Sequence, residues 1–328
     1  MLKYIIKRIL ISVLIIFGVT FITYTLFRLM PDNYVYNKFA AQSQNNPNWE
    51  EQAYRVMELY GLNRGVVEGY FKWLGSALQG DFGYSFIREG MEVTTMIKNA
   101  LPVSFIMSLI VTVLQLVIAI PLGIKAAVNQ YGVTDYATTI FTLLGISLPS
   151  FFFSGIVIKI FAVDLGWFDA SLGLQSGGFS GNGFELFLNR AWHLVIPITV
   201  STLLSLGGLM RFTRTNMLEV LSADYIRTAR AKGVKQASVV YKHAFKNTAI
   251  PLVTMLAGIL PGLFGGSMII EQIFGIQGIG YWSYQATTQG DIPFVMAYVA
   301  FVSVLTVLGI FIADIMYAVV DPRVRLGG

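Results

Sequence analysis

The sequence predicts an all-α membrane protein with six transmembrane helices and one polar insertion. The first observation is the composition: 55% of the 328 residues are hydrophobic and only 12% are charged, which is unlike a soluble domain. The second is that six segments contain no Asp, Glu, Lys or Arg, and each can cross about 30 Å of hydrocarbon. These segments are residues 9–27, 99–124, 136–158, 194–210, 247–270 and 292–313.

The first apolar segment follows three cations, Lys3, Lys7 and Arg8. A cleaved signal peptide has the same order of charge and apolar residues, but this apolar run is too long and no A-x-A site follows it closely. We therefore expect a retained first helix, preceded by a short N-terminus, within residues 1–30.

Residues 31–98 form a polar insertion between the first and second predicted spans. Within it, "NWEEQAYRVMELYGL" places apolar residues at helical spacing, and Gly61 stands where a helix would end. The insertion also contains many aromatic residues. These features favour a small folded element over the alternative of a mere spacer.

The second predicted span carries a stripe of polar residues. Ser104, Ser108, Thr112 and Gln115 recur at spacings that place them on one helical face. Such a face can pack against another helix or line a pore, and the sequence leaves both possibilities open. Between the third and fourth spans, the Gly- and Ser-rich residues 172–190 predict an irregular loop.

The distribution of cations predicts the orientation. With the N-terminus inside, the inner segments hold 14 Lys and Arg against 5 Asp and Glu, and the outer segments hold 7 against 13. Cationic loops stay on the cytoplasmic side, so the chain is expected to begin and end in the cytoplasm. The net charge of +5 is then a signal of topology, and no nucleic-acid partner is expected.

The longest inner loop, residues 211–246, predicts a short helix of about ten residues. Ser222 can cap it, Asp224 suits its first turn, and Gly233 can end it in the left-handed conformation. Cations surround a small apolar patch of Tyr225, Ile226 and Ala229. The cations by themselves are explained by their role in setting the membrane orientation and by contacts with anionic lipid headgroups. The compact helix with its sharp end also suits docking into a groove of a soluble partner, with Tyr or Ile as anchor.

The fifth predicted span is rich in helix-breaking residues, namely Gly258, Pro261, Gly262, Gly265 and Gly266. Close helix approach and a hinge are equally compatible with them. The following "FGIQGIG", residues 274–280, lacks the G-x-G-x-x-G spacing, and flexible turns are expected there.

Several kinds of chemistry are excluded or disfavoured by what the chain lacks. It has no Cys, only two His, and no Gly-Lys dipeptide, so thiol chemistry, a two-His metal site and a phosphate-binding loop are not expected. The apolar segments carry no Asp, Glu, Lys or Arg, whereas ion-coupled carriers bury charged or coordinating groups near the bilayer midplane. The sequence thus predicts a protein that is not an enzyme, with energy supplied from elsewhere.

Four stretches of the chain together resemble a known family. They are "YIIKRILISVLIIFGVTFITYTLFRLMP" at 4–31, "SADYIRTARAKG" at 222–233, "HAFKNTAIPLVT" at 243–254 and "LPGLFGGSMIIEQIFGIQGIG" at 260–280. In this order they resemble the permease subunits of bacterial ATP-binding-cassette importers, and most closely the first permease of oligopeptide and dipeptide importers. Three places depart from the family pattern: Arg227 stands where the general docking motif has Glu, "HAFK" at 243–246 stands where it has I-x-L-P, and "PDN" at 31–33 replaces P-G-D-P.

The resemblance implies the fold of a type I importer permease in the bacterial cytoplasmic membrane. Residues 99–317 would then form the transmembrane domain with its docking loop, and residues 318–328 a cytoplasmic tail. The docking helix implied by the resemblance comprises Asp224, Tyr225, Ile226, Arg227, Thr228, Ala229, Arg230, Ala231, Lys232 and Gly233.

The resemblance also implies the partners. They are a homologous second permease, two cytoplasmic ATPases that bind ATP and Mg²⁺, an extracytoplasmic binding protein, a peptide substrate and membrane lipid. A permease for nickel chelates is the alternative within the same family. An ion-coupled carrier, a channel and a membrane-embedded receptor are the alternatives outside it.

Overall fold

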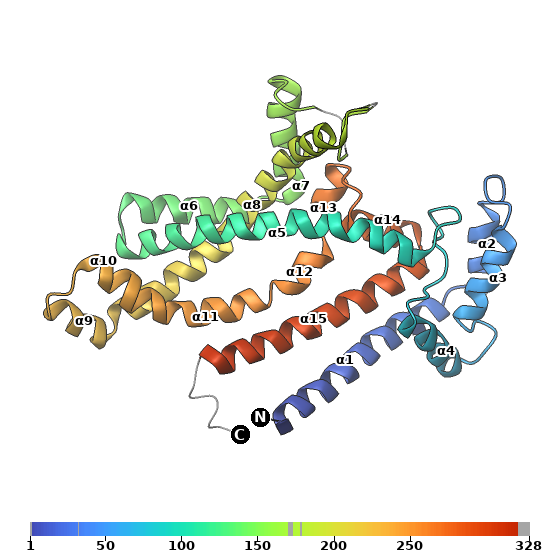
Figure 1. Ribbon diagram of the computed structural model, residues 1–328, viewed down its shortest axis with the longest axis horizontal. Helices are drawn as coiled ribbons and strands as arrows, with labels where there is room; N and C mark the ends of the chain where they lie inside the picture. Colours follow the sequence, from blue (N-terminus) through green and yellow to red (C-terminus); the bar gives the residue numbers. More distant parts are fainter. Residues whose placement is uncertain (1, 32, 170–172, 178, 321–328) are drawn as a thin grey trace.

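The computed structural model describes residues 2–31, 33–169, 173–177 and 179–320. These residues form helices and connecting loops without any strand, and a single isolated bridge pairs Tyr84 with Glu92. The insertion helices lie at one end of the molecule, and α9 (Asp224–Ala231) and α10 (Gln236–Ser238) lie at the other, with the long helices between them (Figure 1). The all-α prediction is confirmed for the described residues. The predicted tail, residues 318–328, lies outside them from residue 321 onward.

Four described helices are long and apolar enough to cross a membrane. These are α1 (Leu2–Arg28), α5 (Val93–Val128), α8 (Gly183–Ser222) and α15 (Ile292–Val320). A bent pair of shorter helices makes a fifth span if the two parts are counted together. The described helices therefore give four or five spans by length and composition.

The third apolar segment is bent by 105°. It consists of α6 (Val133–Ser147), α7 (Ser150–Val157) and a π-helical continuation, Ile158–Asp164. The bend lies at Pro149, which has no amide hydrogen and favours extended backbone in the residue before it. Leu148 is accordingly extended, with φ −80° and ψ 124°.

The fifth apolar segment is divided into short helices. After α10 (Gln236–Ser238) and the π-helical Val239–Ala244, the chain forms α11 (Phe245–Ala257), α12 (Leu260–Gly265) and α13 (Met268–Ile273). Pro261 lies in the first turn of α12, and Gly266 ends that helix with φ +69°. A residue with a side chain rarely adopts this conformation, so a glycine is needed where the helix ends.

The insertion folds into three helices at one end of the molecule (Figure 1). They are α2 (Tyr34–Ala40), α3 (Trp49–Leu59) and α4 (Val66–Leu78). The amphipathic helix predicted from "NWEEQAYRVMELYGL" is confirmed as α3. Gly61 ends it with φ +59°, and a Cβ there would approach the Gly69 Cα to 2.6 Å, so the close crossing of the chain excludes a larger residue.

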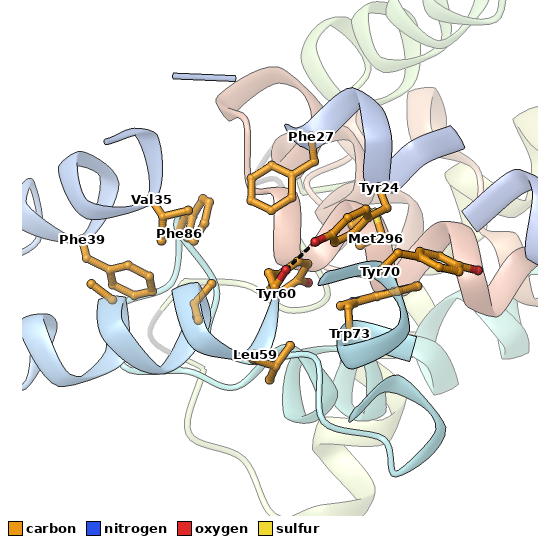
Figure 2. Packing of buried hydrophobic residues seen from close by; sticks show 12 residues of the cluster. Tyr24, Phe27, Val35, Phe39, Leu59, Tyr60, Tyr70, Trp73, Phe86 and Met296 are labelled. Atoms are coloured by element: carbon orange, nitrogen blue, oxygen red, sulfur yellow. Dashed lines mark hydrogen bonds between the residues drawn. The ribbon is translucent and has the colours of Figure 1, made fainter. Parts of the chain in front are cut away.

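Aromatic side chains form the core of the insertion and attach it to α1. Figure 2 shows Tyr24 and Phe27 of α1 packed around Tyr60, Tyr70 and Trp73. The Tyr24 hydroxyl donates to the Tyr60 carbonyl at 2.5 Å. A buried hydroxyl without such a partner would be costly, and the bond fixes the insertion on the first helix. These contacts favour a folded element over a spacer.

The insertion is also held to the turn between α14 (Ile279–Gln289) and α15. The Tyr34 hydroxyl donates to the Gly290 carbonyl at 2.6 Å, and Ser85 donates to the Asp291 carboxylate at 2.5 Å. Burial raises the pKa of the Asp291 carboxyl, and the hydrogen bond from Ser85 opposes that shift. The insertion is therefore joined to both the first and the last long helix.

Three local expectations from the sequence are wrong. The loop 172–190 is not irregular throughout, because α8 already begins at Gly183 with a capping box between Asn182 and Glu185. Ser222 does not cap the following helix, since its hydroxyl donates to the Glu219 carbonyl at 2.7 Å. The expectation of flexible turns in residues 274–280 is wrong for Gly278 and Gly280, which are buried in tight packing, whereas Gly275 does lie in a turn, with φ +63°.

Candidate functional site

A cavity of about 430 Å³ lies between α5, α7, α8 and the divided fifth segment. It is lined by hydroxyl and apolar groups, and none of its lining residues is charged. The hydroxyl-bearing residues that line it are Ser108, Thr112, Ser150, Ser201, Ser205 and Ser267. We refer to it as the serine cavity.

The predicted polar face of the second span divides into two roles. Ser108 and Thr112 line the serine cavity. Gln115 instead donates from Nε2 to the Ser205 carbonyl at 2.8 Å, which ties α5 to α8. Ser104 is fully buried and donates to the Glu271 carboxylate at 2.8 Å. One helical face thus serves both helix packing and the lining of a cavity.

Five of the six lining hydroxyls form no hydrogen bond with a described residue, since only Ser205 donates, to the Thr202 carbonyl at 2.9 Å. Ser201 Oγ is buried and forms no hydrogen bond with any other described residue, and the same holds for the neighbouring Thr202 Oγ1. Of these two, only Ser201 lines the cavity. A buried hydroxyl without a partner costs free energy, and a turn of the Ser201 side chain toward the cavity would let a ligand with amide or carbonyl groups satisfy it.

These two neighbours provide a matched test of the cavity. We expect Ser201→Ala to lower the uptake of a transported ligand about fivefold, the equivalent of one modest hydrogen bond, without reducing the amount of folded protein. Thr202→Val removes an equally unpaired hydroxyl outside the cavity and is expected to leave uptake unchanged. Uptake by reconstituted vesicles measures both. Equal uptake by the two variants would contradict a ligand contact at Ser201.

Glycines and a proline shape the wall formed by the fifth segment. Gly262 lines the serine cavity, and a Cβ there would meet no atom within 4 Å. Gly265 accepts a hydrogen bond from the Tyr298 hydroxyl at 3.0 Å, which joins α12 to α15. Gly258 lies in the gap between α11 and α12, and Pro261 follows it. Gly258, Pro261 and Gly266 therefore lie at breaks in the fifth segment beside the cavity, whereas Gly262 and Gly265 lie within α12.

Glu271 is the fully buried centre of a hydrogen-bond cluster next to the cavity. Its carboxylate accepts from Ser104 Oγ at 2.8 Å, from the Ser267 amide at 3.0 Å and from the Tyr281 amide at 2.9 Å. Ser104 Oγ in turn accepts from the Ile279 amide at 2.8 Å. The cluster joins α5, α13 and α14. We call it the Glu271 cluster.

Glycines make the Glu271 cluster possible. A Cβ on Gly278 would lie 2.5 Å from a Glu271 oxygen, and one on Gly266 would lie 2.7 Å from the other. A Cβ on Gly280 would lie 2.9 Å from the Met268 amide nitrogen. These three glycines therefore let the backbone segments on either side approach the Glu271 carboxylate closely.

The predicted docking helix is α9, Asp224–Ala231. Only Ala223, with extended backbone, separates it from α8. Ile226 is fully buried and Ala229 nearly so, in a cluster with Met217 of α8 and residues of the π-helical segment. Gly233 ends the turn with φ +74°. The inner face of α9 is thus packed on the long helix that it follows.

The other face of α9 is exposed. Tyr225 is 49% exposed, and Arg227 pairs with Asp224 at 3.6 Å in open solvent. The remaining predicted docking residues, Thr228, Arg230, Ala231, Lys232 and Gly233, are also exposed. Because Ile226 points into the chain itself, Tyr225 is the side chain available as an anchor for a partner.

Sequence reasoning missed the groups that join distant parts of the chain. Glu271 stands at the end of an apolar run and gives no sign of burial, and its partner Ser104 is 167 positions away. Asp135 and Arg214 form a largely buried ion pair across 79 positions. A Glu within a stretch of closely spaced glycines is the signal that could have indicated the first of these.

Two family models match this chain. "Binding-protein-dependent transport system inner membrane component" matches residues 119–326, and the N-terminal model of such membrane components matches residues 1–110.

Among curated proteins, the chain is 38% identical to the oligopeptide transport system permease protein AppB of Bacillus subtilis over 99% of this chain and 100% of that protein. It is 32% identical to the oligopeptide permease OppB of Haemophilus influenzae, with the same coverage. It is 31% identical to the dipeptide permease DppB of Bacillus subtilis over 99% of both chains.

A solved structure has a similar fold. The MetNI methionine ABC transporter, in an inward-facing conformation, contains a chain that aligns with a TM-score of 0.52 and 19% identity. The alignment covers 69% of this chain and 96% of that one. At this identity the likeness concerns the fold alone.

Proposed function

The chain belongs to the family of binding-protein-dependent transport system inner membrane components, and we propose that it is a permease subunit of an ATP-driven importer of peptides. The family is one of membrane transport components rather than enzymes. Full-length relatives named as oligopeptide and dipeptide permeases favour peptides over nickel chelates.

We propose six spans with both termini in the cytoplasm. The four long helices and the bent third segment supply five, and the divided α11–α13 segment supplies the sixth, because residues 247–270 contain no charge. The excess of Lys and Arg in alternate loops supports this orientation. On this topology residues 31–98 lie outside and residues 211–246 inside.

The serine cavity is proposed to form this subunit's half of the translocation path. Its unpaired hydroxyls, among them those of Ser108, Thr112 and Ser267, can bond to the main chain of a peptide, which every peptide offers whatever its side chains. The absence of charged groups from its lining avoids a preference for acidic or basic peptides. A homologous second permease would supply the other half.

The proposed energy source is ATP hydrolysis by two partner subunits that bind ATP and Mg²⁺. Their closure would push α9, and because one residue joins α9 to α8, α8 would tilt and open the cavity outward. An extracytoplasmic binding protein would deliver the peptide at the side of the insertion.

The observation that carries this proposal is the two-faced packing of α9. Its inner face is buried on α8 through Ile226, whereas its outer face presents Tyr225 and several cations to solvent. A helix fixed in this way can transmit a push, and an aromatic side chain among exposed polar groups suits a pocket on a partner.

The replacement Tyr225→Ala tests the proposal. We expect it to weaken the association with the ATPase subunits at least tenfold and to lower uptake to the same extent, as for an aromatic anchor at an interface. Tyr241→Ala is the matched control, since Tyr241 is exposed in the same loop outside α9. Copurification and ATP-dependent uptake are the measurements. Uptake that persists without any ATPase would contradict the proposed function.

A further inference from the structure

A second cavity, of about 340 Å³, lies between α6 and α8 and shares no lining residue with the serine cavity. Its polar lining comprises Thr138, Thr139, Thr142, Arg211, Arg214 and Thr215. Four hydroxyls and two guanidinium groups thus face one small space. On the proposed topology this space lies in the cytoplasmic half of the membrane. We call it the threonine–arginine pocket.

The charges of the pocket do not balance. Arg214 binds the Asp135 carboxylate through Nε and Nη2, the latter at 2.9 Å from Oδ2. Asp135 is only 4% exposed and also accepts from the Tyr131 amide at 2.9 Å. Arg211 is exposed and forms no ion pair within the described chain. Two cations against one carboxylate leave the pocket with one positive charge in excess.

Hydrogen-bond donors also remain available in the pocket. The ion pair uses Nε and Nη2 of Arg214, so Nη1 of Arg214 remains available to donate to a ligand. Thr139 and Thr215 are exposed at the rim. Guanidinium and hydroxyl donors around one excess positive charge are the groups that bind a phosphate oxygen.

An apolar surface adjoins this polar pocket. On α6, Ile140 is 58% exposed, and Leu143 and Leu144 are exposed to a similar degree. Leu143 and Met210 complete the pocket lining. A ligand that places an anionic group against the arginines would therefore lay its apolar part along α6. This combination matches a phospholipid.

We propose that the threonine–arginine pocket binds the headgroup of an anionic phospholipid from the cytoplasmic leaflet. A phosphodiester with no amine supplies the one negative charge that the pocket lacks. A zwitterionic headgroup would bring an ammonium group toward Arg211 and is disfavoured. The lipid would bridge α6 and the part of α8 that leads to α9. This inference depends on the orientation proposed above but not on which solute is transported.

The test uses the complete importer in lipid nanodiscs that contain phosphatidylcholine with added phosphatidylglycerol. Native mass spectrometry then counts the phosphatidylglycerol retained by each complex. We expect retention by the wild type and an affinity about fivefold lower for Arg211→Gln. Lys242→Gln removes the same charge from an exposed site outside the pocket and should retain the lipid. Arg211→Lys keeps the charge and should retain most of the binding.

Three outcomes would overturn the proposal. The first is equal retention of phosphatidylglycerol by the wild type and by Arg211→Gln in a folded complex. The second is equal retention of phosphatidylcholine and phosphatidylglycerol. The third is displacement of the lipid by millimolar inorganic phosphate, which would identify a site for soluble anions instead. If Arg211→Gln fails to fold, Thr215→Val removes one hydroxyl at the rim and should lower retention more mildly; unchanged retention would count against the site.

Discussion

Replacing Glu271 with alanine is expected to disrupt the structure beside the serine cavity. The change would leave the Ser104 hydroxyl and the amides of Ser267 and Tyr281 without their acceptor. Each buried donor without a partner costs about 1–3 kcal/mol, so we expect the free energy of unfolding to fall by about 4 kcal/mol. Thermal unfolding of the purified complex should occur at a lower temperature, and both its yield and its uptake should fall about tenfold.

Two further variants make this prediction specific. Gly278→Ala keeps the carboxylate but places a Cβ 2.5 Å from it, so it should reproduce the defect. Glu219→Ala removes an exposed carboxylate from α8 and should behave as the wild type. If Glu271→Ala unfolds at the wild-type temperature, the cluster does not hold α5, α13 and α14 together.

Replacing Ile226 with aspartate is expected to abolish the mechanical coupling between the ATPase subunits and α8. Ile226 is fully buried beneath α9, and an unpaired carboxylate in such a site costs several kcal/mol. We therefore expect α9 to detach from α8 and the association with the ATPase subunits to fall about a hundredfold, which corresponds to about 3 kcal/mol. Copurification measures the association.

Limited proteolysis shows whether α9 has detached. Trypsin should cleave Ile226→Asp after Arg227 and Arg230 much faster than it cleaves the wild type, because a detached helix exposes its backbone. Ala237→Asp adds the same charge at an exposed position outside α9 and should be cleaved at the wild-type rate. Wild-type cleavage of Ile226→Asp would mean that α9 does not depend on this contact.

The long helices could be predicted from the sequence because they depend on composition alone. Long runs without charged residues predict α1, α5, α8 and α15. Breaks were harder to place. Pro149 in the third run and Gly266 in the fifth signal a departure from helix, but the 105° bend depends on what packs on each side. Propensity alone does not contain that information.

The candidate site could be predicted only where it is local. The exposed face of α9 and its end at Gly233 follow from residues within one short stretch. The sequence suggested Tyr225 and Ile226 equally as anchors, and tertiary packing decides between them by burying Ile226 against Met217. The Glu271 cluster depends on contacts between distant segments, which periodicity does not report.

The central claim is that the exposed face of α9 touches an ATP-hydrolysing partner while its inner face moves α8. The chain contains no Cys, so Tyr225→Cys gives this chain a single attachment point for a photoreactive crosslinker, and the labelled chain is then assembled into the whole importer. Illumination during ATP-driven uptake should yield an adduct with the ATPase subunit, and Tyr241→Cys should yield little. Adducts with lipid alone at position 225, while uptake continues, would contradict the account.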